Sequence, residues 1–303
     1  MDSPGERMVD VVVELPFYLL QTLRLVHAIG ETGFRLCVEP DDEKAVVLLK
    51  KVFGLEYKVG TGGAQRISGL YVDHLTPLTR VGSIERPLIM PNGVLRHCRA
   101  GWPKEREIDV SFTGLLTDSR QAAINRWLSL SGLEQISVPA EPKFLGRQVR
   151  RVVRKLGFPV EDTVATGNVT IHASERGRHF PHKAWNARYY DLMLKSKFVL
   201  CPSGDFKRDG VAWTYRFFEG VMCGTIPVIE QPCAAYEGYR YHLMSEPLPA
   251  LRWSSEDAMH NFRLAQQQLT VDAGELRAEV LSLLSAANAG RVQRDYVGRV
   301  FAT

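Results

Sequence analysis

The sequence predicts an α/β fold with two domains, each built from a parallel sheet with helices packed on it. Short β-rich runs alternate with helical patterns along the chain, which is typical of parallel sheets. The length of 303 residues exceeds one ordinary domain and suits two. Turn residues gather around residues 91–93 and 101–103, after which the alternation begins again. We therefore expect domains over residues 1–98 and 104–303.

In the first domain, the β-rich run 9–15 ends at Pro16, and apolar residues at helical spacing follow as far as Gly30. A second helix is expected to start at residues 41–43, since acidic residues in a first turn suit the helix dipole, and to end at Gly54. The remaining expected strands are 34–38, 57–59 and 70–72.

In the second domain, the same patterns predict a longer alternation that ends in a helical tail beyond Ser254. The expected strands are 108–112, 135–138, 169–171, 198–201 and 226–229. The expected helices begin at residues 119, 143, 189 and 214, and the second of them, 143–156, is basic. Two such units indicate two Rossmann-type domains facing a cleft, with ligands at the carboxyl ends of the strands.

Composition excludes several classes of protein. The hydrophobic fraction of 45% and the charged fraction of 24% are ordinary globular values, which excludes disordered, collagen-like and coiled-coil chains. A net charge of +4 is too small to indicate nucleic-acid binding. We find no signal-peptide pattern at the start and no apolar run near the roughly 20 residues that cross a bilayer. We expect a soluble cytoplasmic protein, at most peripheral to a membrane.

Several chemical motifs are absent or incomplete. The five cysteines form no CxxC pair, so we expect reduced core thiols and no structural zinc. The run 60–65 lacks the third glycine of a dinucleotide fingerprint, because Gln65 stands there; it is expected to be a turn or an acceptor-side loop. His179 and His182 flank Pro181 and fit no usual ligand pair. Without an Asp-x-Asp pair, we expect no metal and no cofactor, and a bound diphosphate must meet side-chain cations and backbone N–H groups.

The stretch 189–230 carries the most chemical information. Its loop 202–210 contains two cations, and the following helix opens with Thr214 and Arg216. A hydroxyl, a guanidinium and free N–H groups at a helix start form an anion site suited to a diphosphate. Glu219, one turn later, suits a donor-rich group such as a ribose diol. The alternative is that Arg216 and Glu219 form an ordinary surface pair.

This stretch resembles the nucleotide-sugar-binding part of the exostosin family of glycosyltransferases. The resemblance rests on Tyr190 and Leu194 with Ser196-Lys197-Phe198, Cys201-Pro202-Ser203-Gly204, Thr214-Tyr215-Arg216-Phe217-Phe218-Glu219, and Gly224-Thr225-Ile226-Pro227-Val228. It implies a GT-B fold, with the C-terminal domain holding the donor. It also implies Arg216 at the diphosphate, Thr214 beside it, Ser203 and Gly204 in the donor loop, and Glu219 at the ribose. The stretch is similar, too, to the α-fucosyltransferases, which usually have Thr-Glu-Lys in place of Thr214-Tyr215-Arg216.

Other residues supplement this site. Gly114 and Arg120 follow a strand where backbone approaches donor phosphates, although a turn glycine and a solvated helix residue are the alternatives. Arg176 lies in the polar loop 172–187, which is expected to border the nucleobase and ribose or to be merely solvated.

An inverting transfer needs a general base, whereas a retaining transfer can dispense with one. Glu14, Asp73 and His74 follow expected strand ends and are the candidates for that base. The Glu14 carboxylate could instead stabilise the N-terminus of the following helix, and Asp73 and His74 could simply form a turn after their strand.

The leading interpretation is a metal-independent glycosyltransferase that moves a sugar from a nucleotide-sugar donor to a glycan or lipid-linked acceptor. The alternatives are a non-catalytic nucleotide-binding partner of another transferase and an α-fucosyltransferase-like enzyme using GDP-fucose. The basic helix 143–156 is expected to be a solvated face or to contact an anionic membrane or a polyanionic acceptor. Nucleic acid is not the expected partner, because aromatic residues are not interleaved with the cations.

Overall fold

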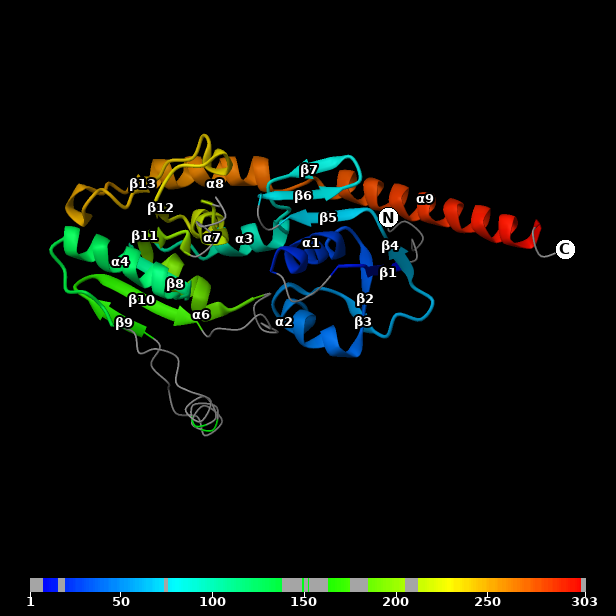
Figure 1. Ribbon diagram of the computed structural model, residues 1–303, viewed down its shortest axis with the longest axis horizontal. Coiled ribbons are helices and arrows are strands. Elements are labelled where there is room, and N and C mark those ends of the chain that lie inside the picture. The colour runs from blue at the N-terminus through cyan, green and yellow to red at the C-terminus, as the bar shows by residue number, and fades with distance from the viewer. Residues whose placement is uncertain are drawn as a thin grey trace. The chain divides into compact units, whose positions relative to one another are not determined.

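The computed structural model describes residues 8–15, 20–73, 76–137, 149, 152, 163–174, 185–204 and 212–300, with side chains as far as residue 286. The chain divides into two compact units (Figure 1). Unit 1 comprises Met1–His97, Arg178–Asn186 and Gln266–Thr303, and unit 2 comprises Cys98–Gly177 and Ala187–Ala265.

Unit 1 contains a four-stranded sheet in the order β3-β2-β1-β4 and a separate three-stranded sheet in the order β5-β6-β7. All pairs in the first sheet are parallel, and both pairs in the second are antiparallel. The elements are β1 (Val9–Val13), α1 (Leu20–Gly30), β2 (Phe34–Val38), η1 (Pro40–Asp42), α2 (Glu43–Phe53), β3 (Tyr57–Val59), β4 (Gln65–Ile67), β5 (Leu70–Asp73), β6 (Leu78–Val81), β7 (Ile84–Arg86), α3 (Asn92–Ala100), which runs on into unit 2, and α9 (Ala273–Val300).

The C-terminal helix α9 packs on β4, β6 and α1 of unit 1. The backbone N–H of Ser83 donates to Glu279 Oε1 at 2.7 Å, and Arg277 Nη1 donates to the carbonyl of Thr32 at 2.9 Å. The expected domain 104–303 assigned this tail to the second domain, whereas these contacts group it with the first. Its helical character matches the prediction.

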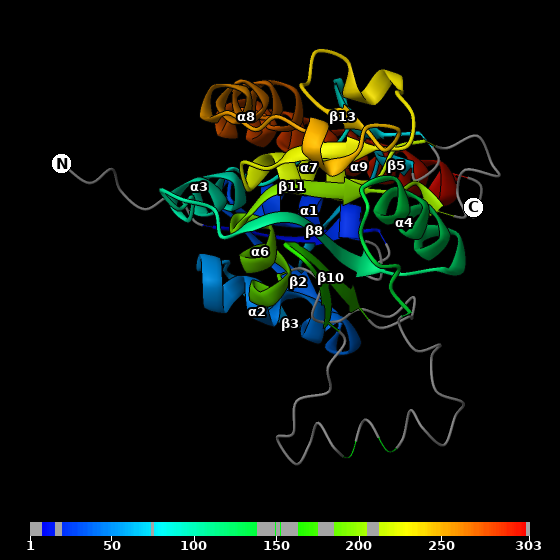
Figure 2. The same cartoon turned by 90° about the vertical axis from the view of Figure 1, so that its left-hand side faces the viewer.

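Unit 2 contains one sheet in the order β13-β12-β11-β8-β10-β9, in which only the β9–β10 pair is antiparallel. Helices flank this sheet (Figure 2). The elements are β8 (Ile108–Leu115), α4 (Asp118–Leu130), β9 (Thr163–Thr166), β10 (Val169–Ser174), α6 (Ala187–Leu194), β11 (Ser196–Cys201), α7 (Tyr215–Met222), β12 (Ile226–Ile229), η3 (Ala234–Tyr236), β13 (His242–Leu243), η4 (Leu248–Ala250) and α8 (Ser255–Leu269). The core between them includes Val110, Phe112, Ile124, Trp127, Ile171, Phe198, Leu200 and Val228.

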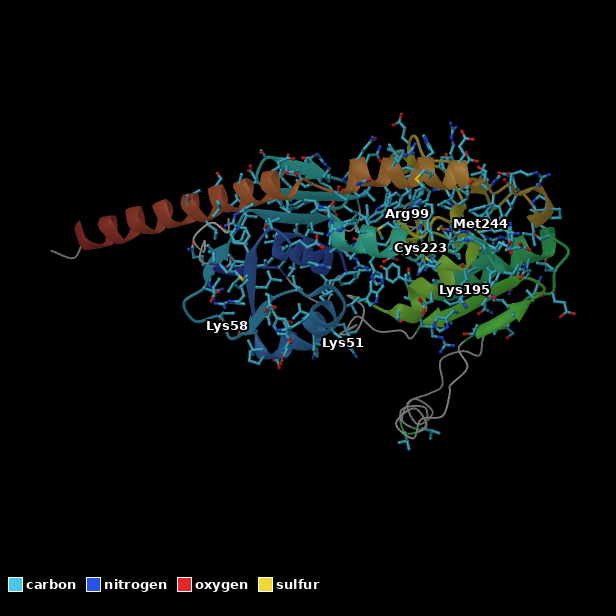
Figure 3. All side chains as sticks on the ribbon, turned by 180° about the vertical axis from the view of Figure 1, so that it is seen from behind. Lys51, Lys58, Arg99, Lys195, Cys223 and Met244 are labelled. Carbon is cyan, nitrogen blue, oxygen red and sulfur yellow. The ribbon has the colours of Figure 1, made fainter. Side chains whose placement is uncertain are left out.

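A half-buried arginine, Arg106, bonds the C-terminal ends of two helices in unit 2. Arg106 Nη1 donates to the carbonyls of Leu194 at 2.9 Å and Ser196 at 2.6 Å, and its Nη2 donates to the carbonyl of Cys223 at 2.9 Å. Burial lowers the pKa of Arg106 to about 10. Figure 3 labels Lys195 and Cys223, which follow α6 and α7. Arg106 therefore anchors both helices that bear the candidate site.

The α/β class is confirmed, with a parallel sheet in each unit, while the facing cleft and the GT-B arrangement stay predictions. One local expectation is wrong, and two others differ in detail. Residues 135–137 form no strand, because the Asn125 side chain bonds both the N–H and the carbonyl of Ile136 at 2.9 Å. The expected strand 70–72 forms as β5, but in the antiparallel sheet. The expected turn at 91–93 instead leads into α3, which begins at Asn92.

All five cysteines are free, and Cys37, Cys98, Cys201 and Cys223 are buried. The thiols of this set thus contribute to packing as small apolar groups. No helix in the described part of the chain is long and apolar enough to cross a membrane. Of the expected basic helix 143–156, only Val149 and Val152 are described, and both are exposed. The rest of that helix lies outside the described residues.

Candidate functional site

The candidate site lies at one edge of the unit 2 sheet. Strands β8, β10, β11 and β12 run parallel to one another, so their carboxyl ends lie at the same edge of the sheet. Ligands of α/β sheets bind at this edge. Most of the residues predicted to bind the donor lie in these strand ends or at the starts of the helices that follow them.

Arg216 lies in the first turn of α7 and is only 6% exposed. Its Nε donates to the carbonyl of Thr113 at 2.6 Å, and its Cζ lies 4.1 Å from the centroid of the Phe112 ring. Its Nη1 is buried and has no hydrogen-bond partner among the described residues. A buried guanidinium N–H without a partner is costly, and a bound anion would remove that cost. The surface-pair alternative for Arg216 is wrong, because the side chain is buried.

Gly114 makes room for this guanidinium. Its φ of +138° is a conformation that favours glycine, and a β-carbon there would lie 3.3 Å from Arg216 Cζ and closer still to Nη2. The residue is therefore more than a turn glycine, because any side chain at this position would displace Arg216.

A second buried guanidinium, that of Arg120, lies at the same edge. Thr117 caps α4, and Arg120 three residues later is 8% exposed, with Nη1 donating to the carbonyl of Leu115 at 2.9 Å. Gly204, with φ of +73°, leaves space for it, since a β-carbon there would lie 2.6 Å from Arg120 Nε. The alternative of a solvated helix residue is wrong for Arg120. Gly114 and Gly204 thus each accommodate one buried arginine.

Cys201 is the last residue of β11, and its buried thiol feels the positive charges of Arg216 and Arg120. Burial raises its pKa to about 12, while the positive charges of Arg216 and Arg120 act in the opposite direction. Desolvation outweighs the cations, so the thiol stays neutral near pH 7 and leaves their charge available for an anion.

Glu219 is held at both carboxylate oxygens. It is 3% exposed, and it accepts hydrogen bonds from the hydroxyl of Tyr189 at Oε2 and from the hydroxyl of Tyr190 at Oε1, the latter at 2.9 Å. Burial raises the pKa of Tyr189 well above its ordinary value, and the negative charge of Glu219 adds a smaller effect in the same direction. Both phenols therefore act as donors to Glu219.

Thr214 and Ser203 are bonded within the unit. The Thr214 backbone N–H donates to the Tyr236 hydroxyl at 2.6 Å. Ser203 donates through its N–H to Glu230 Oε2 at 2.8 Å and through Oγ to the carbonyl of Ala212 at 2.9 Å. The hydroxyl of Ser203 thus joins the end of β11 to the segment that leads into α7, and Thr214 lies at the start of α7, two residues before Arg216.

Three residues at this edge were missed as site residues from sequence: Tyr189, Glu230 and Tyr236. Tyr189 and Tyr190 form a visible Tyr-Tyr pair, but only Tyr190 belongs to the family pattern. Glu230 directly follows the buried strand β12, and a polar residue at the carboxyl end of a parallel strand is a recognisable candidate for a site residue. Nothing in the sequence around Tyr236 connects it with Thr214, because 22 residues separate them.

The two described candidates for the general base, Glu14 and Asp73, belong to unit 1 and lie beside two different sheets. Glu14 follows β1, and its Oε1 lies 3.1 Å from Arg66 Nη1 in an exposed ion pair. Asp73 ends β5 in the antiparallel sheet and accepts a hydrogen bond from Thr76 Oγ1 at 2.6 Å. His74 and Arg176 lie outside the described residues. Glu14 and Asp73 are therefore not united by one sheet edge.

In the described ranges, no group of three His, Cys, Asp or Glu side chains forms a metal-binding cluster. Among the described residues at this edge, the buried cations are the guanidinium groups of Arg120 and Arg216.

Similarity to known proteins is found among solved structures. No protein-family model matches the chain, and no curated protein matches it. Among solved structures, AviGT4, a glycosyltransferase involved in avilamycin A biosynthesis, is 14% identical with a TM-score of 0.46, covering 92% of this chain and 98% of that chain. The GtfA/B complex is 12% identical with a TM-score of 0.29, covering 83% of this chain and 45% of that chain. At these TM-scores, the function must be argued from the site.

Proposed function

We propose that the chain is a glycosyltransferase that moves a sugar from a nucleotide-sugar donor to a glycan or lipid-linked acceptor without a metal ion. The single observation that supports this most is the buried Arg216 guanidinium at the start of α7, with one N–H group that has no partner in the described part of the chain. It lies at the sheet edge where α/β proteins bind nucleotides.

In this proposal, Arg216 and Arg120 offset the charge of the donor diphosphate, together with the N–H groups of the α7 start. The leaving nucleoside diphosphate gains negative charge as the glycosidic bond breaks. Preorganised cations in a site shielded from water stabilise that charge without further rearrangement. Glu219 would repel a phosphate, so its place in the proposal is at the ribose hydroxyls.

The test is a thermal-shift panel of UDP, GDP and their sugar conjugates, followed by measurement of donor hydrolysis. The proposal predicts protection by one nucleotide class together with slow release of free sugar. Protection without hydrolysis would favour a non-catalytic nucleotide-binding partner, and selective use of GDP-fucose would favour a fucosyltransferase-like enzyme. Absence of protection by every nucleotide would overturn the proposal.

Metal independence has its own test. Because the proposed diphosphate site has two guanidinium groups, we expect transfer to be largely retained in excess EDTA. Loss of activity in EDTA, followed by full recovery with Mn²⁺, would contradict this part of the proposal.

A further inference from the structure

A hollow of about 500 Å³ lies in unit 2 beside the edge strand β13. Its lining comes mainly from the chain segment 236–242, together with Arg252 and with Asp257 in the first turn of α8. This volume is within the range of about 300–1,000 Å³ that is typical of small-molecule sites. Neither Arg216 nor Glu219 lines the hollow, so it is a place other than the one proposed for the diphosphate.

Tyrosine rings supply the apolar part of this lining. Tyr236, Tyr239 and Tyr241 all contribute to it. Tyr236 stacks on Phe217 with ring centroids 3.7 Å apart, and Tyr239 packs edge-on against the same ring at 5.3 Å. Tyr241 is half-buried. The packed rings hold the shape of the hollow, and a half-buried tyrosine offers an apolar ring face together with a polar hydroxyl.

Two exposed arginines line the hollow, and their backbones are held in place. The side chain of the buried Asn261 accepts from the N–H of Arg240 and donates to its carbonyl, both at 2.7 Å. Nε2 of His242 lies 3.0 Å from the carbonyl oxygen and 3.2 Å from the backbone nitrogen of Arg252, while Nδ1 lies 2.8 Å from Glu246 Oε2. The described residues contain no ion pair of Arg240 or Arg252 with a carboxylate. The hollow therefore has two multiple hydrogen-bond donors on a fixed backbone.

We propose that this hollow binds a neutral saccharide, at a site separate from that of the nucleotide donor. The tyrosine rings pack against the apolar C–H face of a sugar ring, while Arg240 and Arg252 donate hydrogen bonds to its hydroxyl groups. Glu237 and Asp257 also line the hollow, and carboxylates accept hydrogen bonds from hydroxyl groups. Because both signs of charge are present, the lining favours a neutral polyhydroxyl ligand over a phosphate, which the carboxylates would repel.

Tyr239 gives an independent indication of a ligand with hydroxyl groups. It is 5% exposed, and its hydroxyl has no hydrogen-bond partner among the described residues. Burial raises the pKa of this phenol, so the hydroxyl stays protonated. A buried hydroxyl without a partner is costly, and a hydrogen bond to a saccharide would remove that cost. Tyr239→Phe should therefore weaken saccharide binding without lowering the stability of the protein.

The experiment measures binding of maltotriose, cellotriose, triacetylchitotriose and the acidic trigalacturonic acid by calorimetry. At least one of the three neutral trisaccharides should bind to the unmodified protein. Tyr241→Ala and Arg252→Ala should each weaken that binding by at least about tenfold, through loss of a ring face and of a charged donor respectively. Tyr239→Phe should weaken it by about fivefold, the value of one hydrogen bond. Arg263→Ala, at an exposed arginine of α8 outside the lining, is the matched control and should bind as the unmodified protein does.

Parallel titrations with UDP and GDP separate this inference from the proposed function. Tyr241→Ala and Arg252→Ala should leave nucleotide affinity unchanged, and Arg216→Ala should leave saccharide affinity unchanged. If Tyr241→Ala fails to fold, the exposed Arg252→Ala provides the same test. The inference is overturned if no neutral trisaccharide binds, if both lining variants bind it as tightly as the unmodified protein, or if trigalacturonic acid binds more tightly than all three. Failure to bind UDP or GDP, with saccharide binding intact, would instead overturn the proposed function alone.

Discussion

The charged candidates of the two units differ in burial and in bonding. In unit 2, Arg216 and Glu219 are 6% and 3% exposed at the carboxyl edge of a parallel sheet. In unit 1, the side chains of Glu14 and Arg66 are 44% and 47% exposed and pair with each other. A surface pair of this kind stabilises a protein by about 0–1 kcal/mol. Burying a charge is costly unless it is paired and hydrogen-bonded, so buried charged groups at the ligand-binding edge of a parallel sheet are candidates for ligand binding.

Burial alone does not define a site, because unit 1 also buries polar groups. His27 on α1 is 1% exposed, and its ring lies 4.9 Å from that of Phe53. Phe53 in turn packs edge-on against Trp185 at 5.0 Å, and Trp185 against His97 at 4.9 Å. This cluster consists of aromatic and imidazole rings packed on one another, whereas the sheet edge of unit 2 contains guanidinium groups, glycines and the start of a helix. We therefore expect substitutions in the ring cluster to lower stability and substitutions at the sheet edge of unit 2 to weaken ligand binding.

The largest effect is expected for Gly114→Ala. The new β-carbon would both strain the backbone and displace Arg216, so we expect a loss of about 3 kcal/mol in unfolding free energy and loss of nucleotide binding. Urea unfolding and calorimetry measure the two effects. Gly132→Ala is the control, since Gly132 has φ of +72° with nothing near its β-carbon position; it should cost about 1 kcal/mol and leave binding intact. Equal losses in both variants would show that Arg216 does not need the space at Gly114.

A smaller, pH-dependent effect is expected at His27. Burial lowers its pKa below the ordinary 6.5, against the opposing effect of Glu31. The folded protein therefore favours the neutral ring, so the stability that this ring contributes is complete above 6.5 and is lost as the pH falls below 6.5. Urea unfolding at about pH 7.5 and about pH 5.5 should show a smaller loss in His27→Gln than in the unmodified protein. The exposed His260→Gln serves as the control, and an equal loss in all three proteins would contradict the assignment.

The smallest effects are expected for Glu14→Gln and Asp73→Asn. Both side chains lie on the surface of unit 1, so stability should change by less than about 0.5 kcal/mol and nucleotide affinity by less than about twofold. Transfer assays then decide their chemical role. A fall of more than about tenfold at unchanged nucleotide affinity identifies the general base. Unchanged transfer in both variants would remove them as candidates, and weakened nucleotide binding would break the contrast between the units.

The sequence predicted the alternation of strands and helices in unit 2, because the apolar runs of β8, β11 and β12 and the turn residues between them are strong local signals. It also predicted that most of the candidate site residues lie at one edge, since parallel strands place successive carboxyl ends together; their binding of a donor stays a prediction. It missed the strand-free segment at Ile136, where a single distant side chain, Asn125, replaces a strand partner. It missed the return of α9 to unit 1, because helical periodicity does not say which sheet a helix covers.

Side-chain partners were the least predictable part of the site. The spacing of Arg216 and Glu219 fits a surface pair as well as a buried site, and only the packing of α7 on β11 and β12 distinguishes the two. The bonds of Glu219 to Tyr189 and Tyr190 span about 30 residues, and no local pattern indicates them. Periodicity reveals which face of a helix is buried, but not which polar atoms meet there.

The most direct test of the central claim is calorimetric titration of UDP and GDP into Arg216→Ala. We expect binding to be weakened by at least about thirtyfold, or ~2 kcal/mol, because the anion loses a charge-assisted hydrogen bond. Arg216→Lys should recover only part of this, since an ammonium group cannot bond two oxygens in a fork. Arg263→Ala, an exposed arginine of α8, is the control and should bind as the unmodified protein does. An Arg216→Ala variant that is folded by circular dichroism and binds both nucleotides with unchanged affinity would place the donor site elsewhere.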